Sequence, residues 1–404
     1  MPADPPDPAG FDLRHLPPGF HADPYPIYRA LRAADPVRRM PDGSVFLTRH
    51  ADCVAVYRDA ATYSSDKRAE FAPKYGVTKL FDHHTTSLVF NDPPLHSRVR
   101  RLIMGALTQR AIAAMEPALV ALVDLLLDAA AARGEIDLIG DFAAAIPVEV
   151  IGNLLAIPRA ERANLRDWSL AILGALEPAL TPGQHARGNR AVADFLAYLT
   201  GLVAERRRHP GDPAQDVLTR LIAGEGADRL SEPELLHNCI FILNAGHETT
   251  TNLIGNALVA LTAWPGERVR LAAEPGLIGS AVEEFLRYES SNQLGNRITT
   301  TETELAGQRL AAGTPVTLCI GAANRDPAVF ADPDRLDLAR APNRHLAFGF
   351  GVHQCAGRSL ARQEGRIAIG RFLARFPRYD LSAPPVRGMR ARFRGFLSAP
   401  ARLT

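Results

Sequence analysis

The stretch on which the fold assignment depends is "HLAFGFGVHQCAGRSLARQEG", residues 345–365. It places one cysteine, Cys355, in a glycine-rich turn directly before a run of helical composition. The glycines Gly349, Gly351 and Gly357 allow the backbone to turn tightly and to lie close to a flat group. A thiol in front of a helix N-terminus meets partial positive charge, which favours the metal-binding thiolate. Taken alone, an isolated cysteine is more often a buried structural residue.

Composition and charge are those of an ordinary globular protein. The chain has 404 residues, 47% hydrophobic and 22% charged, with a formal net charge of +2. Such a balance creates no strong field for a nucleic acid or an anionic membrane. No apolar run approaches about 18 residues, and residues 1–24 lack the pattern of a signal peptide. We therefore expect a cytoplasmic protein with neither a membrane nor a nucleic acid as partner.

The chain shows no sign of division into several units. Internal repeats, low-complexity linkers and breaks in composition are not evident, which predicts a single domain over residues 1–404 with a flexible segment at residues 1–20. The four cysteines are far apart and include no C-x-x-C pair, which argues against a disulfide framework or a zinc site.

The fold class is predicted to be mainly α with a small β region. Residues 37–49 place Pro-Asp-Gly between two extended runs, which predicts a hairpin, and residues 304–320 favour strand. Apolar side chains at three- and four-residue spacing predict helices over residues 108–132 and 190–208.

A long central helix is predicted to begin after Ser231. Ser231 and Glu234 form an S-x-x-E capping box, and the apolar pattern continues to Trp264. About 30 residues would span roughly 45–50 Å, enough to cross a domain. The run "AGHETT", residues 245–250, interrupts this pattern with polar groups that need a reason to be buried.

The pattern of residues around Cys355, from Phe348 to Arg362, resembles the haem-binding signature of the cytochrome P450 superfamily at each of its defining positions. By this resemblance Cys355 is the axial thiolate ligand of haem b, where it would donate electron density to the iron. His353 would reach a haem propionate, Phe348 would pack near the thiolate, and Gly349 would lie in the loop against the haem.

Residues 245–250 are similar to the oxygen-binding motif of the same family. There Ala245 and Gly246 would open a groove for O₂, and Glu248 and Thr249 would deliver protons, because O–O cleavage requires them. Alone, the motif would rather indicate a helix kink with hydroxyls bonded to the backbone.

Two further motifs agree with the resemblance. Glu284 and Arg287 resemble the E-x-x-R helix, which with Arg340 would form a buried structural network; alone, such a pair is usually a surface ion pair. The second motif holds His96 and Arg100, four residues apart. The resemblance places these two residues at the haem propionates, together with His353 and Arg297.

These motifs imply a monooxygenase that inserts one atom of O₂ into an organic substrate. The chain carries no flavin or iron–sulfur motif, so electrons would come from a separate ferredoxin or flavodoxin with its reductase, docking near Arg358 and Arg362. The alternatives are a peroxygenase driven by hydrogen peroxide and a haem-thiolate protein that binds a ligand without turnover. Both make the retained pair Glu248 and Thr249 harder to explain.

The substrate is predicted only as small to medium and largely apolar, with one hydrogen-bonding group. By motif position, the residues that we expect to face the pocket are Phe241, Asn244, Ala245, Gln293, Leu294 and Phe393. For the amides of Asn244 and Gln293, a structural role is given equal weight: they would bond the backbone or water rather than a substrate.

The only three lysines of the chain, Lys67, Lys74 and Lys79, lie in one segment, residues 64–90. The resemblance makes this segment the mobile roof of the substrate pocket. The lysines are most simply interpreted as solvated charges. The alternative is a lid that attracts an anionic substrate, such as a carboxylate.

Overall fold

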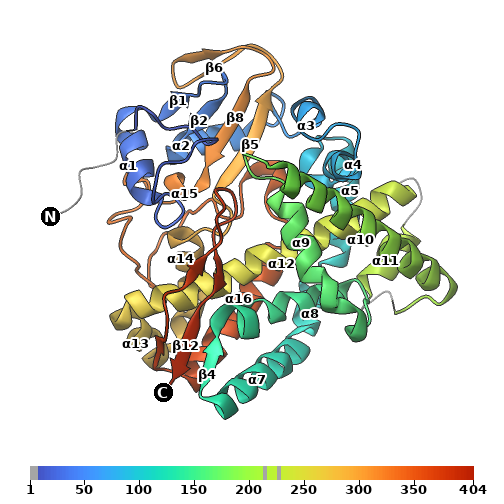
Figure 1. Ribbon diagram of the computed structural model, residues 1–404, viewed down its shortest axis with the longest axis vertical. Helices are drawn as coiled ribbons and strands as arrows, with labels where there is room; N and C mark the ends of the chain where they lie inside the picture. The colour runs from blue at the N-terminus through green and yellow to red at the C-terminus, as the bar shows by residue number, and fades with distance from the viewer. Residues whose placement is uncertain (1–7, 213–215, 225–228) are drawn as a thin grey trace.

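The computed structural model describes residues 8–212, 216–224 and 229–404. Helices make up most of the molecule and the strands form four small sheets (Figure 1), as the mainly α prediction requires. The helices are α1 (Tyr25–Ala34), α2 (His50–Arg58), α3 (Arg68–Tyr75), α4 (Lys79–Thr86), α5 (Leu95–Ala106), α6 (Gln109–Ala114), α7 (Glu116–Arg133), α8 (Ala145–Leu154), α9 (Leu165–Gly174), α10 (Pro182–Arg208), α11 (Val217–Ala223), α12 (Glu232–Ala263), α13 (Pro265–Ala273), α14 (Ile278–Tyr288), α15 (Ile320–Ala323) and α16 (Arg358–Arg375). The strands are β1 (Val37–Arg39), β2 (Val45–Leu47), β3 (Tyr63–Ser64), β4 (Glu135–Asp137), β5 (Leu294–Thr299), β6 (Thr303–Leu305), β7 (Gln308–Leu310), β8 (Pro315–Cys319), β9 (Tyr379–Leu381), β10 (Val386–Arg387), β11 (Phe396–Ser398) and β12 (Pro400–Leu403).

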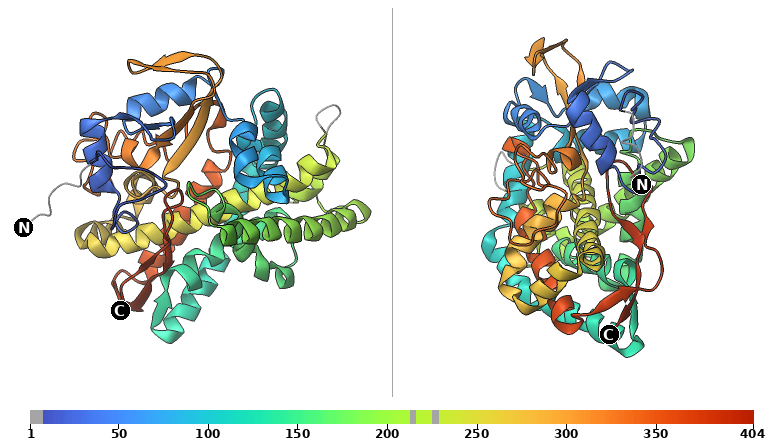
Figure 2. Two further views of the ribbon diagram at one scale, coloured as in Figure 1. Left: turned by 45° about the horizontal axis from the view of Figure 1, so that its top comes forward. Right: turned by 90° about the vertical axis from the view of Figure 1, so that its left-hand side faces the viewer.

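The longest helix, α12, crosses the molecule (Figure 2) and confirms the predicted central helix. The Ser231 side chain accepts a hydrogen bond from the Glu234 N–H, and the Glu234 carboxylate accepts one from the Ser231 N–H at 2.8 Å. This box satisfies backbone donors that a helix start leaves free. At 1.5 Å per residue the 32 residues extend about 48 Å.

Helices α8, α9, α10, α14 and α16 pack around α12 and form the main hydrophobic core. Two glycines of α12 allow close contacts with neighbouring segments. A Cβ at Gly246 would lie 2.5 Å from Ile151 of α8, and one at Gly255 would lie 2.4 Å from Ile139. Neither position could hold a larger side chain without displacing its neighbour.

Two predicted helices differ from the observed ones at their boundaries. The helix predicted over residues 108–132 is two helices, α6 and α7. Pro117 lies in the first turn of α7, where it lacks an N–H for continuing an earlier helix, so the chain breaks at Met115. The helix predicted over residues 190–208 begins earlier, at Pro182.

The largest sheet has the strand order β1-β2-β8-β5-β3. Strands β1 and β2 form the predicted hairpin, with Val37 opposite Leu47, and β2 pairs in parallel with β8. The predicted strand region at residues 304–320 contains β7 and β8 and most of β6. This sheet joins the first fifty residues to the segment that leads into the cysteine loop. No helix in the described part of the chain is long and apolar enough to cross a membrane.

The segment predicted to be flexible, residues 1–20, is only partly described. Residues 1–7 lie outside the described residues. Residues 8–20 pack on the molecule, because Phe11 is 2% exposed and its ring centroid lies 5.3 Å from that of Phe46. Burial of an aromatic ring of this size orders the chain around it.

Glu284, Arg287 and Arg340 lie together, as the E-x-x-R resemblance predicts. Arg287 Nε lies 2.7 Å from Glu284 Oε2, both side chains are fully buried, and Arg340 Nε donates to the same carboxylate at 3.1 Å. Arg287 also donates to backbone carbonyls between residues 324 and 335. A buried guanidinium with all these acceptors stabilises the chain before the cysteine loop.

Candidate active site

The cysteine loop, residues 346–357, is held by backbone hydrogen bonds within the loop and by a close contact at a glycine. The Cys355 N–H donates to the Phe348 carbonyl at 2.8 Å. Gly351 has a φ of 71°, and a Cβ there would lie 2.3 Å from the Tyr57 carbonyl oxygen. Only glycine therefore allows the loop to pack against the end of α2.

The surroundings of the Cys355 thiol have opposing effects on its charge. Burial raises the pKa of Cys355, whereas the Gly357 backbone and three guanidinium groups lower it. The guanidinium groups belong to Arg100, Arg358 and Arg362. Arg362 also lies over the Phe348 ring, 4.7 Å from its centroid. The predicted loop residue Gly349 takes a φ of 63°.

Four basic side chains from three segments meet beside the loop. They are His96 and Arg100 of α5, Arg297 of β5 and His353 of the loop. The His96 and His353 rings are 4.0 Å apart, and neither ring nitrogen of His96 has a hydrogen-bond partner among the described residues. Burial, followed by the neighbouring His353, lowers the pKa of His96 to about 4. The Arg297 guanidinium stacks over Tyr57 at 5.1 Å.

Asp92 is part of this group and is missed by the sequence analysis. Its carboxylate accepts hydrogen bonds from Ser64 and from the Ser65 N–H, and it lies 3.9 Å from His353 Nε2. Burial raises the pKa of Asp92, but these donors outweigh it and hold the pKa at about 2. The signal was present, because Asp92 stands four residues before His96, but nothing local indicates its partner.

Ala245 and Thr249 share one face of α12. They stand four residues apart, and the Thr249 hydroxyl donates to the Ala245 carbonyl at 2.6 Å. Ala245 is exposed although most residues around it on the helix are buried. Gly246 does not share this face, since Ile151 fills the space beside it. The predicted groove at Ala245 and Gly246 therefore has only Ala245 on its open side.

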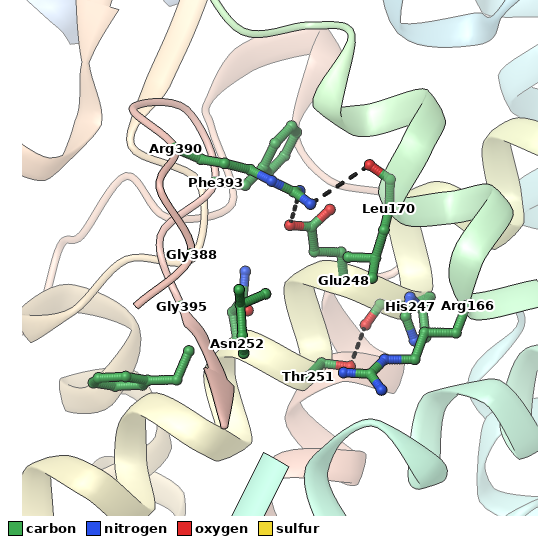
Figure 3. Close-up of a pocket in the computed structure, with 12 residues that line it drawn as sticks. Arg166, Leu170, His247, Glu248, Thr251, Asn252, Gly388, Arg390, Phe393 and Gly395 are labelled. Atoms are coloured by element: carbon green, nitrogen blue, oxygen red, sulfur yellow. Dashed lines mark hydrogen bonds and ion pairs between the residues drawn. The ribbon is translucent and has the colours of Figure 1, made fainter. Parts of the chain in front are cut away.

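Glu248 points to another side of α12, toward the hairpin loop at residues 388–395 (Figure 3). Its carboxylate accepts a hydrogen bond from the Arg390 guanidinium. Burial raises the pKa of Glu248 to about 7, although Arg390 opposes the rise. Both residues line a cavity of about 20 Å³, roughly enough for one water molecule. Glu248 Oε2 has no hydrogen-bond partner in the described chain.

Apart from Glu248 and Phe393, the residues around this cavity are not predicted from the sequence. Besides Arg390, its polar lining includes Arg166, His247, Thr251 and Asn252. One available signal is "RGMRARFR", residues 387–394, which holds four arginines in eight residues. The pattern does not indicate which arginine reaches Glu248, since that depends on how the loop lies over α12.

Two predicted pocket residues lie elsewhere. Gln293 is 1% exposed, donates to the Ser290 carbonyl at 2.7 Å and packs so closely on Gly321 that a Cβ there would be 1.8 Å from its amide oxygen. Leu294 is 1% exposed and belongs to the core cluster around α1. Both are corrections, because the chain at the start of β5 turns these side chains toward α1 and the N-terminal residues that pack with it.

The other predicted pocket residues lie on α12 or near it. Phe241 is half-buried against the core, and Asn244 is buried with its Oδ1 unpartnered among the described residues. Phe393 lines the small cavity beside Glu248.

Comparisons with known proteins agree with this geometry. The family model described as Cytochrome P450 matches residues 277–398. The chain is 35% identical to the biotin biosynthesis cytochrome P450 of Bacillus subtilis, over 90% of this chain and 91% of that protein. It is 38% identical to the vitamin D(3) 25-hydroxylase of Pseudonocardia autotrophica, over 90% and 89%.

Two solved structures are similar over almost the whole chain. P450BioI in complex with an acyl carrier protein bearing hexadec-9Z-enoic acid has a TM-score of 0.90, with 33% identity, and the match covers 95% of this chain and 100% of that one. The myxobacterial cytochrome P450 CYP267B1 in complex with myristic acid has a TM-score of 0.88, with 35% identity and coverage of 97% and 98%.

Proposed function

Because the chain belongs to the cytochrome P450 family of haem b monooxygenases, we propose that it inserts one oxygen atom of O₂ into a small to medium, largely apolar organic substrate. The observation that carries this proposal is on α12. There Glu248, a buried carboxylate with a pKa of about 7, is followed in the chain by Thr249, whose hydroxyl bonds the carbonyl of the exposed Ala245. A protein that only binds a ligand has no use for such a pair.

The donor set fits haem b. A haem needs an axial ligand and partners for two propionates, and this region offers a thiol, two unpartnered ring nitrogens on His96 and several guanidinium groups. We assign Cys355 as the residue whose thiolate would bind the haem iron, with Phe348 and Gly349 around it. The assigned propionate partners are His96, Arg100, Arg297 and His353. When bound, the haem supplies the iron at which O₂ is activated.

The chain's own residues supply the protons. Thr249 presents its hydroxyl on the Ala245 face, and Glu248 holds a proton near neutral pH because burial raises its pKa to about 7. A water in the 20 Å³ cavity can hydrogen-bond Oε2 of Glu248, which has no partner among the described residues, and return a proton to this carboxylate. Arg390 holds the carboxylate at that cavity.

Electrons come from a separate ferredoxin or flavodoxin with its reductase. An acidic donor would dock beside the cysteine loop, where Arg358 donates to the Cys355 carbonyl at 3.3 Å and Arg362 pairs with Glu283. Charge complementarity of this kind increases association rates more than affinity.

Replacing the cysteine tests the haem assignment. Cys355→Ala should abolish the long-wavelength Soret band of the ferrous–CO complex, because a thiolate ligand produces that band. The controls Cys53→Ala, Cys239→Ala and Cys319→Ala should keep it, since these three buried cysteines lie on α2, on α12 and at the end of β8 rather than in the loop. An unchanged band in Cys355→Ala would overturn the assignment.

Isotope labelling tests the function. With NADH, ferredoxin, its reductase and ¹⁸O₂, the product of a medium-chain fatty acid should carry one ¹⁸O atom. Incorporation only from labelled hydrogen peroxide would instead identify a peroxygenase. Ligand binding without any oxidised product would identify a binding protein.

A further inference from the structure

The three lysines of the roof segment occupy different environments. Lys67 is 1% exposed and pairs with Glu70 at 2.6 Å. Lys74 of α3 is half-buried and donates to the Glu177 carbonyl at 2.8 Å. Lys79, at the start of α4, is exposed. The interpretation as solvated charges is therefore wrong for Lys67 and Lys74.

Lys74 shares its environment with Arg392 of the hairpin loop. The Arg392 guanidinium donates to the carbonyls of Leu176 at 3.1 Å and Leu294 at 2.8 Å, and to the side-chain oxygen of Asn296. These contacts join the loop between α9 and α10 to β5, and α3 lies at the same end of the molecule (Figure 1). Burial, together with the nearby Arg392, lowers the pKa of Lys74 to about 8.

The carboxylates around this pair of cations are already engaged. Glu70 pairs with Lys67, and Glu177 accepts hydrogen bonds from two backbone N–H groups of the hairpin loop, at 2.8 and 3.2 Å. Within the described ranges, neither Lys74 nor Arg392 forms an ion pair with a carboxylate. Glu70 and Glu177 attract both cations from a distance, but in this cluster the three cations Lys67, Lys74 and Arg392 outnumber these two carboxylates. Buried charges are normally balanced, so a ligand with one negative group can supply the missing charge.

The neighbouring rings add an apolar surface without adding charge. The His84 ring centroid lies 5.3 Å from that of Tyr75 and 5.7 Å from that of Phe71. Burial, followed by Lys74 and Arg392, lowers the pKa of His84 to about 3, so its imidazole is neutral. The environment therefore suits a molecule with one acidic group and an apolar body.

The hairpin loop connects this site to α12. Arg390, two residues before Arg392, bonds Glu248, and Phe393 lines the cavity beside that carboxylate (Figure 3). One short loop thus carries both Arg390, the partner of the proton-donating carboxylate, and Arg392, one of the two cations.

We propose that Lys74 and Arg392 bind the carboxylate of a fatty-acid-like substrate whose apolar chain extends toward Ala245 on α12. This inference rests on the proposed monooxygenase function and names its substrate class. Beyond its bonds to Leu294 and Asn296, each terminal nitrogen of Arg392 keeps one N–H that can donate to a carboxylate, and Lys74 adds a point charge. The two cations come from segments far apart in the chain, so the site exists only in the folded protein.

A matched pair of ligands tests the proposal. The ferric haem protein is titrated with myristic acid and with 1-tetradecanol, and the spin-state change gives the dissociation constant. Wild type should bind the acid more tightly than the alcohol. Lys74→Gln should weaken acid binding about tenfold, the effect of one charge-assisted hydrogen bond, and leave alcohol binding unchanged. Lys79→Gln is the control and should change neither.

Arg392→Gln should act in the same way, and thermal unfolding shows whether the loss of its three interactions also destabilises the fold. Equal weakening of acid and alcohol binding in Lys74→Gln, or no weakening, would overturn the carboxylate site. If acid binding depends on Lys74 but no ¹⁸O enters the product, the site stands and the monooxygenase function is overturned. If ¹⁸O enters the product but acid binding is independent of Lys74, the monooxygenase function stands and the carboxylate site is overturned.

Discussion

Glu248 and Thr249 are adjacent in the chain but act on different sides of α12. Each helical residue turns about 100° from the previous one, so neighbours cannot share a face. Thr249 pairs with the Ala245 carbonyl, whereas Glu248 pairs with Arg390 beside the small cavity. Proton transfer between them therefore requires a water or a rotation of the Glu248 side chain.

Removing the hydroxyl should uncouple turnover. In Thr249→Ala, substrate binding and NADH consumption should continue, but product per NADH should fall about tenfold or more, with the balance released as hydrogen peroxide. Peroxide and product are measured together. Thr249→Ser is the matched control, because it retains a hydroxyl at the same atom. Full coupling in Thr249→Ala would contradict the role assigned to Thr249.

Removing the counter-ion should shift the pH dependence. Arg390 opposes the effect of burial on Glu248, so in Arg390→Gln the pKa of Glu248 should rise above about 7. The midpoint of coupling against pH should move upward by about one unit. Arg387→Gln is the control. Arg387 lies on the same hairpin but pairs with Glu289, so its replacement should leave the midpoint in place. An unchanged midpoint in Arg390→Gln would show that Arg390 does not act on Glu248.

Among single residues, those carried by contiguous motifs are predictable. The positions of Cys355, His353 and Thr249 follow from short spacing that folding leaves unchanged, whereas their roles stay predictions. Gln293 and Leu294 are placed wrongly, because the direction of a side chain before β5 depends on how the chain enters the sheet. Arg390 is missed for a similar reason, since its partner is 142 residues away.

Helix α16 carries a buried acid that no described residue explains. Glu364 is 2% exposed, its Oε2 has no partner among the described residues, and burial raises its pKa to about 8. The folded state therefore holds this proton more tightly than the unfolded state does. Stability is greatest below the ordinary glutamate pKa and falls as pH rises toward about 8.

The isosteric variant Glu364→Gln removes this dependence. It cannot ionise, so its free energy of unfolding should exceed that of wild type by a margin that grows with pH, by up to about 1.4 kcal/mol per unit, and levels off above about pH 8. Urea unfolding at several pH values measures the margin. The exposed Glu274, changed to Gln, is the control. A margin that does not vary with pH would show that Glu364 has a partner.

Elements with local signals are predicted well. The capping box places the start of α12, and Pro-Asp-Gly places the β1–β2 hairpin, because both depend on residues a few positions apart. The break between α6 and α7 is missed, although Pro117 marks it, because apolar periodicity runs through the break without change.

In the whole molecule, the two ends of the chain are joined through the same region. Arg394 of the hairpin loop donates to the carbonyls of His21 and Ala22, both at 2.8 Å, and pairs with Glu289. Phe11 and Phe20 lie in one aromatic cluster with Phe46. Of the N-terminal segment, the described residues from Phe11 to Ala22 therefore pack against the folded core.

Removing one of these aromatic rings should destabilise the folded protein substantially. Phe11→Ala should lower the free energy of unfolding by about 3 kcal/mol or more, the usual effect of removing a buried aromatic ring. Chemical denaturation measures it. His15→Ala, at an exposed position of the same segment, should change stability by less than about 0.5 kcal/mol. A negligible effect of Phe11→Ala would return residues 8–20 to the flexible interpretation.

The family, its haem and its reaction class follow from motifs that can be read along the chain, because each is a set of residues at short and constant spacing. The counter-ion of Glu248, the position of Asp92 and the unpaired cations Lys74 and Arg392 do not. Each of these depends on contacts between segments about 25 to more than 300 residues apart, and a contact of that kind forms only when the helices and the sheet pack against each other.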